Sequence, residues 1–221
     1  MMLMVRVYPN NDLEESWKSV INNLQKISAD YCTPLYISQQ EEKDFMTIMF
    51  DVTDIDAFAD VLVKNIPSAA DSEKTRTITL LKPVFFPAPK DRARQLERYQ
   101  VAIRVTSDEV HDVFNHTIHL DYSSDLFPTY AAYSFGEDDI LLSMLSVSRE
   151  KIRKFVRESI ESQKGVLGVD VARINMSKRV APTEMWKKYR ESRYLFKPSD
   201  GYEEYDYTEI GAMEGAFVRD V

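Results

Sequence analysis

One unit of sequence occurs twice in this chain. The first copy opens on Val5-Arg6-Val7 and the second on Ile103-Arg104-Val105. The most similar blocks are residues 44–52 and 139–147, which lie 95 positions apart (139 − 44). An internal repeat limits the architecture before any single motif does, because both copies are expected to fold into the same order of elements.

Each copy predicts a strand, a helix, two strands, a helix and a strand. In the first copy, alternation and helical periodicity place these elements at residues 2–9, 13–27, 33–39, 44–52, 53–67 and 75–84. In the second copy they fall at 99–106, 107–118, a hairpin through 129–147, then 149–163 and 166–176. The expected helix N-caps are Asn11 or Asp12, Thr53 and Ser107, and Pro67 is expected to end its helix.

The βαββαβ order is that of the ferredoxin-like unit, whose sheet carries helices on one face only. The bare face must be covered, and a second sheet is a natural cover. We therefore predict an α+β fold in which two tandem ferredoxin-like units form an intrachain dimeric α/β-barrel arrangement. The predicted domains are unit 1, a linker helix, unit 2, and a C-terminal helix with an acidic tyrosine-rich tail, over 1–89, 90–98, 99–181 and 182–221.

Composition limits the environment and the partners. A single cysteine, Cys32, excludes an intrachain disulfide and fits a reducing, cytoplasmic compartment. No signal peptide or membrane-spanning run is expected. The net charge of −8 argues against direct nucleic-acid binding. Basic residues with interleaved aromatics at 186–194 could form a nucleic-acid surface, but a short docked helix with solvated charges is the favoured interpretation.

The second copy resembles a known family. Gly136 and Asp139 at a hairpin turn, an apolar strand, a helix with Phe155-Val156, and a strand after Gly165 together resemble the effector-binding (RAM-type) domain of the leucine-responsive/AsnC regulators. The resemblance covers about 3–84 and 99–180. It implies a dimeric α/β barrel that binds an amino acid or a similar small molecule at subunit contacts. The helix-turn-helix of those regulators has no counterpart here, because the first strand begins at about residue 2.

The ligand-binding residues that this resemblance implies lie at the two hairpin turns. They are Asp44, Gly136, Glu137, Asp138 and Asp139. In the first copy Glu41 stands where the glycine is expected, which weakens the match there. The alternative interpretation is that a turn aspartate simply hydrogen-bonds its own backbone.

The three histidines fall within nine residues and suggest a metal site. If 108–120 is helical, Asp112, His116 and His119 share one face and could hold a divalent ion. The alternative is a polar, solvated helix surface, because the apolar stripe that begins at Val110 and Val113 is expected to face the sheet instead. No cofactor is predicted.

The favoured function is a stand-alone small-molecule-sensing or regulatory-interaction protein, homo-oligomeric and without its own DNA-binding part. The alternative is a dimeric α/β-barrel enzyme of the monooxygenase or haem-handling type that acts in the barrel cavity. A third interpretation is a purely structural assembly module. The sequence shows no Ser-His-Asp spacing, phosphate-binding glycine loop or Cys-x-x-Cys, so no catalytic residue is predicted and the balance leans away from an enzyme.

Overall fold

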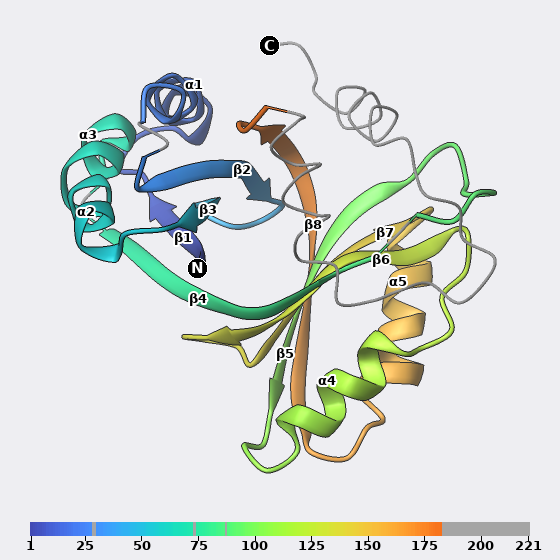
Figure 1. Cartoon of the computed structure of the whole chain (residues 1–221). Coiled ribbons are helices and arrows are strands. Elements are labelled where there is room, and N and C mark those ends of the chain that lie inside the picture. Colours follow the sequence, from blue (N-terminus) through green and yellow to red (C-terminus); the bar gives the residue numbers. More distant parts are fainter. Residues whose placement is uncertain (28–29, 73, 87, 183–221) are drawn as a thin grey trace. The chain divides into compact units, whose positions relative to one another are not determined.

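The computed structural model describes residues 1–27, 30–72, 74–86 and 88–182. These residues form two compact units: unit 1 contains 1–80 and 175–182, and unit 2 contains 81–174. Each unit has an antiparallel sheet with its helices on one face (Figure 1). The predicted fold class, α+β with two tandem ferredoxin-like units, is confirmed.

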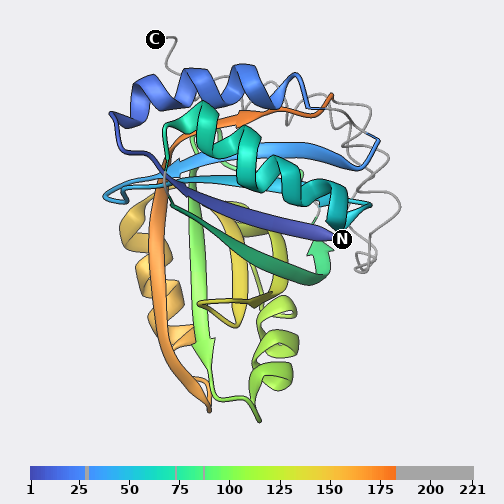
Figure 2. The same ribbon diagram turned by 90° about the vertical axis from the view of Figure 1, so that its left-hand side faces the viewer.

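Unit 1 orders its strands β4–β1–β3–β2. Both of its helical segments cover the same face of this sheet (Figure 2). In chain order the elements are β1 (Met2–Tyr8), α1 (Leu13–Leu24), β2 (Cys32–Gln40), β3 (Met46–Val52), α2 (Ile55–Asp60), the π-helical turn η1 (Val61–Asn65), α3 (Ile66–Ala70) and β4 (Lys74–Phe85).

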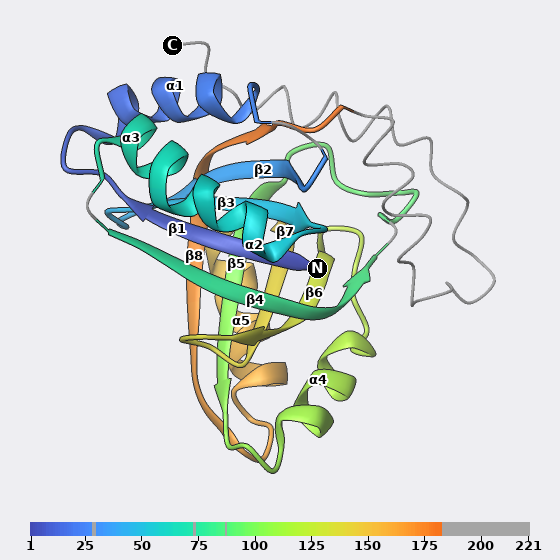
Figure 3. The ribbon, with the colours of Figure 1, turned by 60° about the vertical axis from the view of Figure 1, so that its left-hand side comes forward.

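Unit 2 repeats this plan with the strand order β8–β5–β7–β6. Helices α4 and α5 lie on one side of its sheet (Figure 3). The elements are β5 (Glu97–Val105), α4 (Val110–Ile118), β6 (Leu126–Phe135), β7 (Ile140–Ser146), α5 (Arg149–Phe155), the π-helical turn η2 (Val156–Ile160) and β8 (Val166–Arg179).

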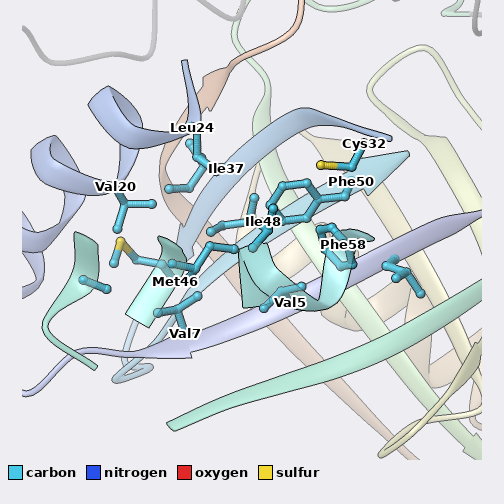
Figure 4. Packing of buried hydrophobic residues seen from close by; sticks show 14 of the residues in the cluster. Val5, Val7, Val20, Leu24, Cys32, Ile37, Met46, Ile48, Phe50 and Phe58 are labelled. Atoms are coloured by element: carbon cyan, nitrogen blue, oxygen red, sulfur yellow. The ribbon is translucent and has the colours of Figure 1, made fainter. Parts of the chain in front are cut away.

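The core of unit 1 lies between its sheet and its helices (Figure 4). Alternate residues of β1, such as Val5 and Val7, point toward the helices, where Val20 of α1 and Phe58 of α2 meet them. The rings of Phe50 and Phe58 pack edge to face at 4.9 Å. This alternation is the expected consequence of strand geometry, in which successive side chains point to opposite faces.

The helix N-caps differ in part from those expected. Asp12 caps α1 as predicted, and its carboxylate accepts the amide of Glu14 at 2.8 Å. The cap of α2 is Asp54 rather than Thr53, because the Asp54 carboxylate reaches the amides of residues 56 and 57. Ser107 caps nothing, because α4 begins at Val110 and its N-cap residue makes no side-chain cap bond.

Pro67 does not end its helix. The π-helical turn η1 shifts the hydrogen-bond register, so that the Ile66 amide bonds the Val61 carbonyl. Pro67 then falls in the first turn of α3, where a missing N–H costs nothing. The helix ends instead at Asp71, which adopts the left-handed conformation with φ 47°.

The linker helix expected over 90–98 does not form. The described residues between β4 and β5 make turns, in which the amide of Arg92 bonds the carbonyl of Pro89 at 3.3 Å. Ala88 and Leu96 hold this segment against Phe127 in a small apolar cluster. The helix and acidic tail predicted from residue 183 onward lie outside the described residues.

The repeat has a different separation from the one that the sequence comparison predicted. Strands β3 and β7 begin at residues 46 and 140 and end at 52 and 146, so the separation is 94 at both ends (140 − 46, 146 − 52) and not 95. The edge strands share a bulged Pro-x-Tyr, with the register shift between Pro34 and Tyr36 in β2 and between Pro128 and Tyr130 in β6. The two Pro-x-Tyr motifs also lie 94 positions apart (128 − 34), and they are a second sign of the repeat.

The bulge has the same role in both units. In unit 1 the amide of Val180, just after β8, bonds the carbonyl of the bulge residue Leu35 at 3.0 Å. In unit 2 the amide of Phe86, just after β4, bonds the carbonyl of the bulge residue Thr129 at 3.2 Å. Each edge strand is therefore joined by the end of a strand that begins in the other unit. An edge that is paired in this way is no longer open to intermolecular pairing there.

Candidate functional site

The face of the unit 1 sheet opposite its helices is buried and partly polar. On β1, Met2, Met4 and Arg6 alternate with the residues that face the helices, and Arg6 is only 7 % exposed. A charged side chain is seldom buried to this extent unless it meets other polar groups. The buried charge therefore makes this face a candidate binding site.

Four polar residues lie in one row across this face. Arg6 is in register with Arg76 of β4 on one side and with Thr47 of β3 on the other, and Thr47 is in register with Ser38 of β2. We call these four residues the Arg6 row. Exposure is 4 % at Thr47 and 2 % at Ser38, whereas Arg76 is exposed. The row thus runs from a buried end on β2 to an accessible end on β4.

Two donor-bearing side chains on the same face of the sheet as Arg6 are buried without a hydrogen bond among the described residues. They are the hydroxyl of Thr47 and the side-chain amide nitrogen of Gln40. Gln40 lies two positions beyond Ser38 on β2, and it is 3 % exposed. Each unsatisfied buried group costs roughly 1–3 kcal/mol. A bound molecule or an ordered water is one explanation for such groups.

Aromatic rings lie next to the cation. The guanidinium carbon of Arg6 lies 5.0 Å from the centroid of the Phe45 ring, and Phe45 packs on Tyr8 at 5.3 Å. The ammonium of Lys74 lies over the other ring of this pair, 4.6 Å from the centroid of Tyr8. These cation–π contacts hold positive charge and apolar ring surface side by side.

Three of the four places in the same row of unit 2 are apolar, and the fourth, in register with Ala102 on β8, is the exposed Asp170. Ala102 of β5 is in register with Leu141 of β7, which is in register with Ala132 of β6. These three residues occupy the places of Arg6, Thr47 and Ser38, and their exposures are 8, 3 and 0 %. Since the backbone plan is the same in both units, the polar row is not a requirement of the fold.

The hairpin residues predicted to bind a ligand are turn residues in the structure. The Asp139 carboxylate accepts the backbone amide of Val105 at 2.7 Å, and its own amide bonds the carbonyl of Ile103. Asp44 is exposed in the corresponding turn of unit 1, and Gly136, Glu137 and Asp138 occupy the turn of unit 2. Both bonds tie Asp139 to β5 and not to the backbone of its own turn, and ligand binding by these hairpin residues stays a prediction.

The predicted metal ligands are not gathered into a site. Asp112 and His116 are exposed on α4, on the polar face that the periodicity indicated, and His119 is exposed as the C-cap residue of this helix. Nδ1 of His119 bonds the carbonyl of Asn115 at 2.7 Å. No group of three or more histidine, cysteine, aspartate or glutamate side chains that could hold a metal occurs in the part of the chain that the structure describes.

The third histidine makes a polar contact that the sequence did not predict. Nδ1 of His111 lies 2.9 Å from the hydroxyl of Tyr133, and its Nε2 lies 2.9 Å from the side-chain nitrogen of Asn115. The ring of Tyr133 stacks on Phe114 at 4.0 Å, and burial raises the pKa of its hydroxyl. The contact between the exposed His111 and Tyr133 joins α4 to β6.

The sequence did contain a signal for the Arg6 row. Arg6 interrupts the apolar strand 2–8, and Thr47 interrupts the apolar strand 46–50. Each could have been recognised as a polar residue at a position buried on the second face of a sheet. What the sequence could not supply was the register that places them side by side.

Comparisons with known proteins support the fold. No protein-family model and no curated protein sequence matches this chain. Among solved structures, a proposed monooxygenase from Lactobacillus acidophilus NCFM matches with a TM-score of 0.52 and 11% identity, over 81% of this chain and 93% of the other. The siroheme decarboxylase NirDL matches with a TM-score of 0.58 and 9% identity, over 87% of this chain and 78% of the other.

These neighbours correct the function expected from the sequence. The resemblance to the leucine-responsive/AsnC effector domain holds at the level of the shared α+β fold, and membership of that family is not confirmed. The favoured function, a stand-alone sensing or regulatory protein, is wrong by this comparison, because these two structures are named as enzymes. The alternative that the sequence left open, a barrel enzyme, is better supported.

No helix in the described part of the chain is long and apolar enough to cross a membrane.

Proposed function

We propose that this chain is an enzyme of the monooxygenase or haem-handling type that acts on a small organic molecule at the Arg6 row of unit 1. The observation that carries the proposal is the pair of buried, unsatisfied donors at Thr47 and Gln40 on the same sheet face as a buried arginine. The named neighbours of the same fold support an enzyme. The cytoplasmic location and the homo-oligomeric state remain predictions from the sequence.

The residues of the row suit a substrate that becomes anionic on oxygen. The guanidinium of Arg6 would stabilise negative charge on that oxygen, and this stabilisation is strong where water is excluded. Thr47 and Gln40 would donate hydrogen bonds to the same group and fix its orientation. The rings of Phe45 and Tyr8 would pack against an aromatic substrate.

A monooxygenase reaction at this site balances with dioxygen as the oxidant. An activated methylene, R₂CH₂, loses a proton to give an enolate that Arg6 stabilises. The enolate then reacts with O₂, and the products are R₂C=O and one water. One oxygen atom enters the substrate and the other leaves as water, so the protein needs to supply only binding, orientation and proton transfer.

A second candidate substrate is a polycarboxylated tetrapyrrole, as the name of the siroheme decarboxylase neighbour suggests. Lys74 and Arg76 of β4, beside Arg6 of β1, place three cations close together on one face of the sheet. Such a strip suits several carboxylates at once. The tetrapyrrole would be the substrate, and no histidine of the described residues lies on unit 1 to ligate its iron.

The experiment that tests the proposal measures two reactions with the purified full chain. Oxygen uptake with anthrone reports the monooxygenase reaction, and carbon dioxide release from iron-uroporphyrin III reports the decarboxylation. We expect one of the two, and we expect Arg6→Ala, which copies Ala102 of unit 2, to reduce it at least 100-fold. If wild type shows neither reaction, or if Arg6→Ala retains full activity, the proposal is wrong.

A further inference from the structure

We infer that unit 1 binds one planar aromatic anion per chain through Arg6, Thr47 and Gln40, and that unit 2 has lost or never had the equivalent site. The inference names the substrate class of the proposed enzyme and to that extent rests on the proposed function. It can nevertheless be tested by binding alone.

The groups that converge on the helix-free face of unit 1 are hydrogen-bond donors. Arg6 carries a permanent positive charge, and the unsatisfied nitrogen of Gln40 can only donate. The unsatisfied hydroxyl of Thr47, in register with Arg6 on the next strand, can donate as well. Donors beside a cation favour an anion over a neutral molecule or a cation, because hydrogen bonds to an ionised acceptor are roughly twice as strong as those to a neutral one.

The positive charge continues toward the accessible end of the row. Arg76 is in register with Arg6 and is exposed, and Lys74, two positions before it on β4, is exposed as well. Within unit 1, β4 is the edge strand of the sheet next to β1. An anion that approaches along β4 therefore meets exposed cations first and the buried one last, an arrangement that raises the association rate at low ionic strength.

The aromatic part of the ligand follows from Phe45 and Tyr8. Both rings lie on the same side of the sheet as Arg6. Phe45 contacts the Arg6 guanidinium, and Tyr8 packs on Phe45. A carboxylate or enolate oxygen at Arg6 would leave the rest of a flat molecule against these rings. Offset or edge-to-face ring contacts of this kind contribute about 0.5–1.5 kcal/mol beyond burial.

The stoichiometry follows from the repeat. Unit 2 places Ala102, Leu141 and Ala132 where unit 1 has Arg6, Thr47 and Ser38. An alanine and a leucine supply neither charge nor hydrogen bonds, and their burial indicates that this row is filled by packing. A duplicated fold would give two sites per chain if both units bound the ligand, so a count of one is a specific expectation.

The test is a calorimetric titration of the full chain with 2-naphthoate, with 2-naphthalenemethanol as a neutral probe of similar shape. We expect one naphthoate per chain and at least tenfold weaker binding of the alcohol. Two binding-site variants copy or mimic unit 2: Arg6→Ala should weaken naphthoate binding at least 100-fold, and Thr47→Val about tenfold. The matched control Leu141→Ala, in the same row of unit 2, should leave naphthoate binding unchanged. Circular dichroism checks that each variant is folded.

The outcomes separate this inference from the proposed function. Naphthoate binding that Thr47→Val and Arg6→Ala weaken supports the anion site, even if no oxygen uptake or decarboxylation is found. Two naphthoates per chain, equal affinity for the alcohol, or full affinity in folded Thr47→Val overturns the inference. If turnover depends on Arg6 but the alcohol binds as tightly as naphthoate, the enzyme stands and the anion selectivity is wrong.

Discussion

Thr47 and Thr129 show how two similar threonines can have opposite effects on stability. The hydroxyl of Thr47 is buried without a hydrogen bond among the described residues, whereas that of Thr129 donates to the carbonyl of Ser143 at 3.2 Å. We expect Thr47→Val to raise the free energy of unfolding by roughly 1 kcal/mol, because it removes an unsatisfied group. Thr129→Val, the control, should lower it by about 1 kcal/mol.

Urea denaturation of the ligand-free protein measures both changes. If Thr47→Val instead destabilises the chain by 1 kcal/mol or more, the Thr47 hydroxyl is satisfied in the free protein, and the strongest argument for a ligand there is lost. A site that costs stability when empty is typical of residues kept for function.

Cys32 is the only cysteine, and the residue is 1 % exposed. Burial raises its pKa from 9.0 to about 11. Above pH 9 the unfolded chain loses this proton while the folded chain keeps it, so stability falls as the pH rises from about 9 to about 11. Over that interval we expect wild type to lose roughly 2–3 kcal/mol relative to Cys32→Ala.

Denaturation midpoints of wild type and Cys32→Ala between pH 8 and 11 give this difference directly. The effect of the alanine on packing is the same at every pH and cancels from the slope. A difference that does not change with pH would show that the thiol titrates alike in the folded and unfolded chain.

At the scale of elements, the helix caps give a matched pair of serines. Ser148 caps α5, and its hydroxyl accepts the amide of Lys151 at 3.2 Å. Ser107 precedes α4 in the sequence but is exposed and two residues too early to cap it. We expect Ser148→Ala to cost about 1 kcal/mol in the free energy of unfolding and Ser107→Ala to stay within about 0.5 kcal/mol.

Thermal unfolding of the two variants and of wild type measures both changes in stability. Equal costs, or a larger cost for Ser107→Ala, would show that α4 begins earlier in solution than its hydrogen bonds indicate.

The elements themselves could be predicted from the sequence to within a few residues, because strand alternation and helical periodicity are local properties. The residue-by-residue alignment of the two copies could not be predicted from the sequence. A separation of 95 aligns Thr47 with Leu142, which faces the helices, whereas the true separation of 94 aligns it with Leu141 on the opposite face. One residue of error exchanges the two faces of a strand and hides the contrast between the polar and apolar rows.

For the candidate site, the sequence emphasised the wrong residues for a physical reason. Clustered histidines and turn aspartates are visible in a sequence because they are neighbours along the chain. Arg6, Thr47 and Gln40 come from three strands, and only the strand register places Arg6 and Thr47 side by side. A site built across a sheet leaves single polar residues in apolar strands as its only trace in the sequence.

At the scale of the whole molecule, the two strand exchanges give the last prediction. The amide of Val180 is the donor to Leu35 in unit 1, and that of Phe86 is the donor to Thr129 in unit 2. Proline has no amide hydrogen, so Val180→Pro leaves the Leu35 carbonyl without this bond and Phe86→Pro does the same at Thr129. We expect each change to lower the free energy of unfolding by about 1–3 kcal/mol. The loss should be greatest in the unit that contains the accepting carbonyl.

Hydrogen exchange resolved along the chain distinguishes the units. Val180→Pro should lower the protection of β2 and β3 more than that of β6 and β7, and Phe86→Pro should give the reverse pattern. The asymmetry arises because each edge strand is completed by residues from the far end of a strand that the other unit begins. If both variants instead lower protection equally in all four strands, the two units open as one cooperative body, and the local bond at each bulge does not control its own unit.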